Sequence, residues 1–182
     1  RLAILTCLSS IFGLLVCSGC SESIATGQVA SPTVAVPAEF AELADAIGSD
    51  EPLSDAAQTP TDVKEAPDPP GMESVVIGKI DAGDFAAIDP SEATFILSEL
   101  PAESHAEDDP DHVDNCPFCQ RKLANAPKAI VRILDGESPA KISVADLFGF
   151  SEGDVVMVSG NARFDEATGA VLIDASKVHR VR

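Results

Sequence analysis

The second half of the chain alternates apolar and polar positions in short stretches, and this pattern predicts β-strands. The stretches are rich in Val and Ile and are separated by Gly, Pro, Asp and Ser, as strands are separated by turns. A short helix is expected over 144–148, before a Gly153-Asp154 turn. Strands are expected over 74–80, 93–100, 128–136, 154–164 and 170–181. We therefore predict an all-β domain over residues 73–182, with the short helix between the third and fourth strands.

This order of elements, with Gly78 in the first strand and "EGDVVMVSG" opening the fourth, resembles the OB-fold. That family is a small five-stranded Greek-key barrel. The Gly153-Asp154 turn and Gly160 belong to the likeness, because glycine allows a barrel strand to curve sharply. The resemblance implies an OB-like barrel whose core takes one face of each strand. The expected core residues are Val75, Ile77, Phe95, Leu97, Val131, Ile133, Leu147, Val156, Val158, Leu172 and Ile173.

The chain opens on a short apolar segment that is typical of a secretion signal. It runs from Leu2 to Cys17 and is shorter than the about 20 apolar residues that span a membrane. The segment ends in "VCSGC", which resembles the lipobox of bacterial lipoproteins. The resemblance implies that residues 1–19 are a signal peptide and that Cys20 is lipidated. The protein would then be a membrane-anchored lipoprotein of the cell envelope, facing the periplasm or the cell surface. Ordinary signal cleavage, with Cys20 as a free thiol, is the alternative.

Residues 20–72 are rich in Ala, Pro, Ser, Thr, Asp and Glu, and Lys64 is their single basic residue. Such a composition does not build a hydrophobic core, so we predict a disordered linker between the anchor and the domain. Within it, "PAEFAELADAIG" has apolar residues at helical spacing and predicts a short helix over 38–47. That helix is either transient or docks on a partner or on the protein's own domain.

A polar insertion over 101–127 separates the second and third expected strands. Loops beyond about 12–15 residues usually need a function or a stabilising element of their own. This one contains His105, His112, Cys116 and Cys119 among many carboxylates. Two thiolates and two imidazoles form the set that zinc takes in closed structural sites, and a divalent cation would offset the nearby acidic charge. We therefore predict a metal site on these four residues, for zinc first and copper(I) second.

Two other uses of the cysteine pair stay open. Outside the cytoplasm, Cys116 and Cys119 can form a disulfide with each other. "CPFC" also resembles the active-site tetrapeptide of glutaredoxins, which implies a nucleophilic first cysteine at the start of a helix, here "QRKLANA". In that family the motif follows the first strand, whereas here an acidic loop precedes it. The many carboxylates nearby are expected to raise the pKa of the thiols.

Composition narrows the possible partners. The chain has 12 Lys and Arg against 30 Asp and Glu, a net charge of −18, and it contains no Trp or Tyr. Nucleic acid is therefore not expected as a partner, because its binding needs basic and aromatic side chains. His179, beside Arg180 and Arg182, is expected to be a solvated strand end.

No nucleophile elbow, P-loop or His-Glu zinc-protease motif is present in the sequence, so an enzyme is the less favoured class. We predict a lipid-anchored binding module with a zinc-stapled loop, for an unidentified protein or small-molecule ligand. The alternatives are a thiol–disulfide redox protein that uses "CPFC" and an envelope protein that delivers or senses copper or zinc.

Overall fold

The computed structural model describes residues 35–66, 72–101 and 116–181. They belong to one compact unit that runs from Pro32 to Arg182. The expected signal segment, Cys20, His105 and His112 lie outside the described residues. Among the residues that are described, no helix is long and apolar enough to cross a membrane.

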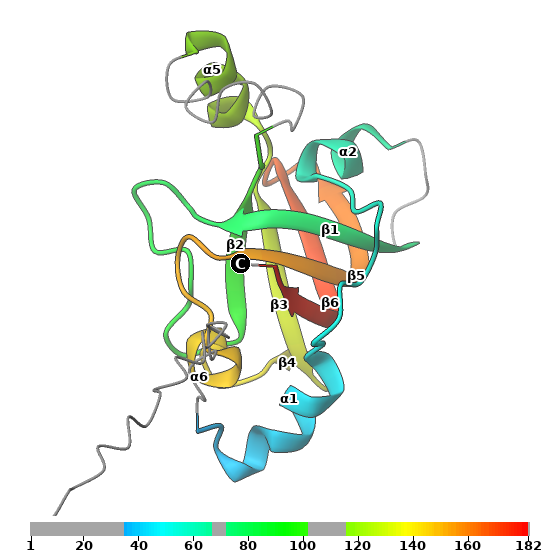
Figure 1. Ribbon diagram of the computed structural model, residues 1–182, viewed down its shortest axis with the longest axis vertical. Coiled ribbons are helices and arrows are strands. Elements are labelled where there is room, and N and C mark those ends of the chain that lie inside the picture. The colour runs from blue at the N-terminus through cyan, green and yellow to red at the C-terminus, as the bar shows by residue number, and fades with distance from the viewer. Residues whose placement is uncertain (1–34, 67–71, 102–115, 182) are drawn as a thin grey trace, which may run out of the picture. The chain divides into compact units, whose positions relative to one another are not determined.

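A six-stranded sheet dominates this unit, so the β-rich domain predicted from the sequence is confirmed (Figure 1). Across the sheet the order is β2-β1-β5-β6-β3-β4, and β2 pairs in addition with β3. The pairings of the five longer strands therefore return to their starting point. The β3–β6 pair is parallel and the other pairs are antiparallel. The strands are β1 (Met72–Ile80), β2 (Thr94–Ser98), β3 (Ala129–Asp135), β4 (Ser138–Pro139), β5 (Val155–Asp165) and β6 (Ala170–Arg180).

The helices are short and lie between or before the strands. The predicted helix over 144–148 is confirmed as α6 (Val144–Phe148), where the Ser143 side chain accepts a hydrogen bond from the Ala145 amide. Gly149 ends this helix with φ 69°, a left-handed conformation that glycine adopts without strain. The other helices within the described residues are η1 (Ala38–Phe40), α1 (Ala41–Ile47), α2 (Pro60–Glu65) and α5 (Pro117–Asn125).

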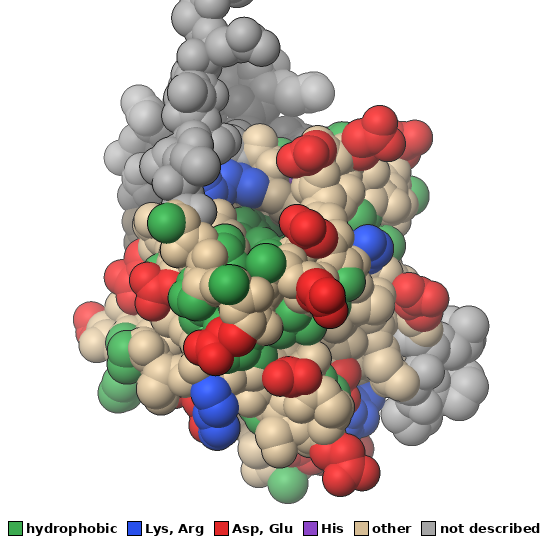
Figure 2. Space-filling model, turned by 90° about the horizontal axis from the view of Figure 1, so that it is seen from below, with side chains coloured by type: hydrophobic (Ala, Val, Ile, Leu, Met, Phe, Trp, Pro, Cys, Tyr) green, Lys and Arg blue, Asp and Glu red, His purple; other side chains and the backbone are tan. Residues whose placement is uncertain are grey.

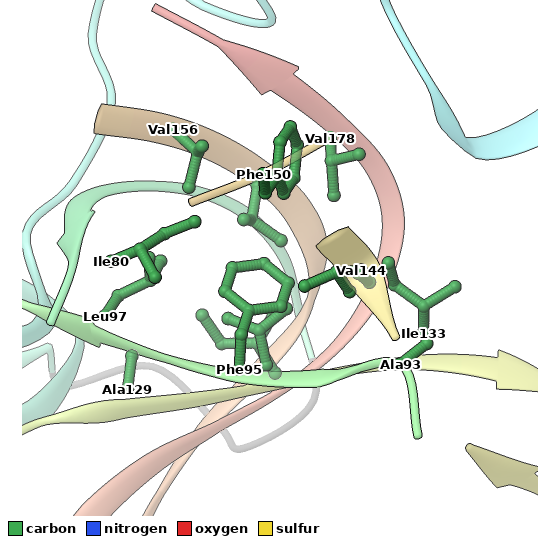
Figure 3. Packing of buried hydrophobic residues seen from close by; sticks show 14 of the residues in the cluster. Ile80, Ala93, Phe95, Leu97, Ala129, Ile133, Val144, Phe150, Val156 and Val178 are labelled. Atoms are coloured by element: carbon green, nitrogen blue, oxygen red, sulfur yellow. The ribbon is translucent and has the colours of Figure 1, made fainter. Parts of the chain in front are cut away.

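The hydrophobic core lies inside the ring of strands, with Phe95 in the middle (Figure 3). The Phe95 and Phe150 rings form a T-shaped pair with centroids 6.1 Å apart and an interplanar angle of 73°, a favourable arrangement for two aromatic rings. Most of the core predicted from the sequence is confirmed. The residues buried as expected are Phe95, Leu97, Val131, Ile133, Leu147, Val156, Val158 and Ile173.

The expected core positions Val75, Ile77 and Leu172 are wrong, because these side chains are half-buried rather than buried. In β1 it is Val76 and Ile80 that are 0% exposed. Side chains alternate along a strand, so an assignment that is off by one residue turns every side chain to the other face. Gly78 shares the inward face with Val76, and a Cβ placed there would lie 2.9 Å from the Leu97 Cβ. The glycine thus permits the close approach of β2 to β1.

Residues 35–66 differ from the expected disordered linker, because they fold against the sheet. The helix predicted over 38–47 matches η1 and α1, and α1 contacts β6. A second helix, α2, begins with a capping box between Thr59 and Asp62 and has Pro60 at its start. Scattered apolar residues cannot build a core of their own, but here they add to an existing one. The side chains that pack against the core are Val36, Phe40, Leu43, Ala44, Ile47 and Val63.

Candidate dithiol site

The cysteine pair lies at the start of α5. Cys116 is the N-cap residue, and Pro117, whose ring fixes φ at a helical value, occupies the first helical position. The Cys119 amide donates to the Cys116 sulfur, with 3.5 Å between N and Sγ. A helix leaves its first amides without partners inside the helix, and here a sulfur satisfies one of them. The first turn of α5 therefore brings both thiols to the same end of the helix.

Both thiols are free in the structure and half-buried. Phe118, between them in the sequence, is 80% exposed and is one of the large apolar side chains on the described surface. The pair is therefore accessible to a metal ion or to a small reagent. An exposed aromatic side chain beside it also adds apolar contact area for a larger molecule.

The pKa values of the two thiols move in opposite directions. Hydrogen bonds from the backbone and side chain of Cys119, with a further one from the Phe118 backbone, lower the pKa of Cys116. The hydrogen bond that Cys119 makes to the Cys116 sulfur, together with partial burial, raises the pKa of Cys119, while the charge of Lys122 opposes that rise. For Cys116 this direction is opposite to the one expected from the carboxylate-rich sequence. The causes of this shift are hydrogen bonds at the start of the helix, which composition does not show.

The rest of α5 carries positive charge in an acidic chain. Arg121 is the middle residue of the helix, Lys122 lies in its last turn, and α5 contains no Asp or Glu. The N-terminal end of a helix also carries a partial positive charge, which favours an anion such as a thiolate. The helix terminus favours the charged form of Cys116, which is the form that binds metals and attacks disulfides, whereas the charge of Lys122 acts on Cys119.

The four predicted metal ligands are only partly covered by the structure. It brings Cys116 and Cys119 together, whereas His105 and His112 lie outside the described residues. Among the described residues, no group of three or more His, Cys, Asp and Glu side chains is placed to hold a metal ion. The metal site therefore stays a prediction.

Two residues near the end of β6 have structural contacts that the sequence did not suggest. His179, expected to be solvated, is half-buried, and its Nδ1 lies 2.9 Å from the Ser49 carbonyl oxygen. The Arg180 guanidinium forms a 3.2 Å ion pair with Asp154 and lies 5.3 Å from the centre of the Phe150 ring. Both side chains hold the end of β6 to neighbouring segments and are accounted for without a ligand.

Comparison with known proteins adds no relative to this chain: no protein-family model, no curated protein and no solved structure matches it.

Proposed function

We propose that this chain is an envelope binding module whose polar insertion is held by a metal ion on Cys116 and Cys119. One observation carries the proposal. Two free thiols lie three residues apart on one helical turn, and the first already accepts an amide hydrogen bond that would stabilise its thiolate. Two sulfurs presented by one turn can bind the same ion, at about 2.3 Å each for zinc. The disulfide alternative would use the same two atoms.

His105 and His112 would complete the coordination. With them the donor set is two sulfurs and two nitrogens, which suits a closed tetrahedral zinc site. Copper(I) is the second choice, because it also prefers thiolates. Metal binding would tie the insertion to the start of α5. The ion would thereby stabilise a loop that is too polar to build a hydrophobic core. A delivery or sensing protein would use the same ligands but exchange its ion readily.

We also propose that the ring of strands is an OB-type barrel. Its support is that the five longer strands pair in a closed cycle and that α6 lies between β3 and β5, the third and fourth of these five. A register shift opposite Ser159 and Gly160, where β6 has the extra residue Ser176, further supports it, since such irregularities bend a strand. OB-folds bind ligands on one face of the barrel, at the second and third strands. Here Ile96 and Ile130 are register partners on that face and are half-buried.

The ligand of this face is proposed to be a protein or a small molecule rather than nucleic acid. The chain is strongly acidic. Figure 2 shows one side of the molecule, where Asp and Glu side chains surround an apolar centre and Lys and Arg are sparse. Phosphate contacts from Lys and Arg provide most non-specific affinity for nucleic acid, and such contacts would be few here.

The metal proposal is tested on the compact unit, residues 32–182, purified without chelator after growth with added zinc. We expect one zinc per chain, and two thiols that react only after a chelator is added. Cys116→Ser should abolish stoichiometric zinc, because one thiolate of the pair is lost. Phe118→Ala is the matched control, since it changes the same turn and keeps both sulfurs. A chain with no metal and no thiols before reduction would contradict the proposal and identify a disulfide.

Thiol–disulfide exchange is the second candidate, favoured by the opposite pKa shifts of the two thiols. In such a protein the cysteine with the lowered pKa attacks the substrate disulfide, and the other resolves the mixed disulfide. Reduction of insulin by dithiothreitol, with and without the metal-free chain, is the assay. Acceleration that Cys119→Ser removes would favour this candidate over the metal site.

A further inference from the structure

The sheet has two stretches of strand edge that its own strands leave uncovered in the described part of the chain. Along its length β1 pairs with β5 on one side, whereas on the other side β2 meets it at Lys79 and Ile80. The parallel pairing of β3 with β6 ends at Ala175, so the last residues of β6 extend beyond it. Uncovered strand edges present unpaired amides and carbonyls, which can pair with another chain.

Residues 48–58 reach both of these edges. At β1, the Gln58 amide donates to the Val75 carbonyl and the Ile77 amide donates to the Gln58 carbonyl, each at 2.8 Å. At β6, the Ser49 amide donates to the Val178 carbonyl at 2.9 Å. Both contacts are parallel bridges, so the segment takes the place of a short added strand at each edge. Figure 1 shows it in cyan, running from α1 past the sheet to α2.

Side chains of β6 hold the first end of this segment. Lys177 Nζ donates to the Ala46 carbonyl in the last turn of α1. The last carbonyls of a helix have no partners within it and carry partial negative charge, so a lysine there is stabilising. His179 Nδ1 contacts the Ser49 carbonyl from the same strand.

The second end is held through α2. The Thr61 amide and hydroxyl donate to the Glu99 carboxylate at 3.1 and 3.0 Å. Lys64 Nζ lies 5.4 Å from the centre of the Phe164 ring in β5, and Val63 packs against the core.

These anchors are few compared with the continuous pairing inside the sheet. No residue of α1 is buried, and in α2 the buried residue is Pro60. Segments with little burial and exposed hydrogen bonds open at lower free energy than the core does.

We propose that residues 46–66 form a strap that opens as one unit and that, when closed, shields the β1 and β6 edges from pairing with a second copy of this chain. Because one segment covers both edges, we expect the loss of anchors at one end to weaken the contact at the other. The closed strap keeps the unit monomeric, and the open strap permits association.

The first test uses the unaltered unit and native-state hydrogen exchange at low denaturant concentrations. The amides of Ser49, Gln58 and Ile77 should show one common opening free energy, lower than that of core amides such as Val158. Different opening free energies for Ser49 and Gln58 would show two independent contacts and overturn the single strap.

The second test loosens one end and observes the other. Gln58→Pro removes the amide that donates to Val75, and we expect Ser49 exchange to rise about tenfold together with that of Ile77. The same variant should form dimers in a concentration-dependent manner by analytical ultracentrifugation. Gln58→Ala is the matched control, because it retains the backbone hydrogen bonds and should behave as the unaltered unit.

If the exchange rate of the Ser49 amide is unchanged in Gln58→Pro, the strap does not open as one unit. Fast exchange of both edges with a strictly monomeric protein would overturn its shielding role. If Gln58→Pro does not fold, Lys177→Ala tests the same coupling from the other end, and it should accelerate exchange at Ile77.

Discussion

At Cys116 a sulfur caps a helix where an oxygen usually does. The sequence predicts only part of what this sulfur does. The spacing of Cys116 and Cys119 indicated a common ligand or a mutual bond, and the structure has both thiols on one turn. The direction of the Cys116 pKa was not foreseen. Acidic residues can be counted in the sequence, whereas amides that point at the sulfur exist only once the helix has formed.

Alkylation of the reduced, metal-free chain tests the difference between the two thiols. An ordinary thiol has a pKa of about 8.5, so below that pH a thiol with a lowered pKa has the larger thiolate fraction. We expect iodoacetamide to modify Cys116 before Cys119 between about pH 6 and pH 8, with the preference declining as the pH rises. Peptide mass spectrometry at short reaction times measures the order. Faster modification of Cys119 would show that the amide hydrogen bonds do not determine which thiol has the larger thiolate fraction.

Val75 and Val76 test the inward face of β1 with the same substitution at neighbouring positions. Val76 is 0% exposed, so Val76→Ala should lower the free energy of unfolding by about 2 kcal/mol through lost burial and a residual cavity. Val75→Ala, at a half-buried position, should cost less than half of that. Denaturant unfolding of both variants provides the comparison. Equal costs would mean that the register of β1 is misassigned.

At the scale of elements, strands with strong alternation and the helix α6 were predictable, because local pattern alone specifies them. The two residues of β4 are too few to show a period. The helix α2 carries the capping signal of Thr59, Pro60 and Asp62, but its Ala- and Asp-rich surroundings hid that signal. The prediction of which face of β1 points inward was wrong for a different reason. A run of three β-branched residues, Val75 to Ile77, gives no polar position to mark which side faces water.

Gly160 lies at the register shift between β5 and β6, where the two backbones approach closely. A Cβ placed there would lie 2.2 Å from the Asp174 carbonyl oxygen, so Gly160→Ala must displace the backbone of β6. We expect a loss of about 3 kcal/mol or more in the free energy of unfolding. Gly169→Ala is the control: nothing lies within 4 Å of a Cβ there, and its φ of 68° limits the cost to about 1–2 kcal/mol. Similar costs for the two variants would contradict the close approach of β5 and β6.

At the scale of the whole molecule, composition misjudged residues 35–66. Their polarity correctly excludes a separate core, yet it does not exclude packing on a core that other residues build. The alternation of the later strands does not show which strand edges stay unpaired. Those edges provide the backbone partners of Gln58 and Ser49 in the segment. Long-range pairing of this kind depends on the folded sheet and not on local pattern.

The proposed anchor at Cys20 is tested in a bacterial host that lipidates its own lipoproteins. Metabolic labelling with an alkyne-bearing fatty acid should label the chain, and the membrane fraction should contain it, since several acyl chains on one residue bind membranes firmly. Cys20→Ser should lose both the label and the membrane association. Cys17→Ser is the matched control and should retain them. Equal labelling of the two variants would contradict a lipobox ending at Cys20.

The measurement closest to the central claim is zinc-edge X-ray absorption on the zinc-loaded unit, residues 32–182. We expect two sulfur neighbours at about 2.3 Å and nitrogen neighbours at about 2.0–2.1 Å from the metal. The Cys119→Ser variant should lose one of the sulfurs or fail to bind zinc at all. A coordination shell built only from nitrogen and oxygen would contradict the account, because the metal would then not be bound by Cys116 and Cys119.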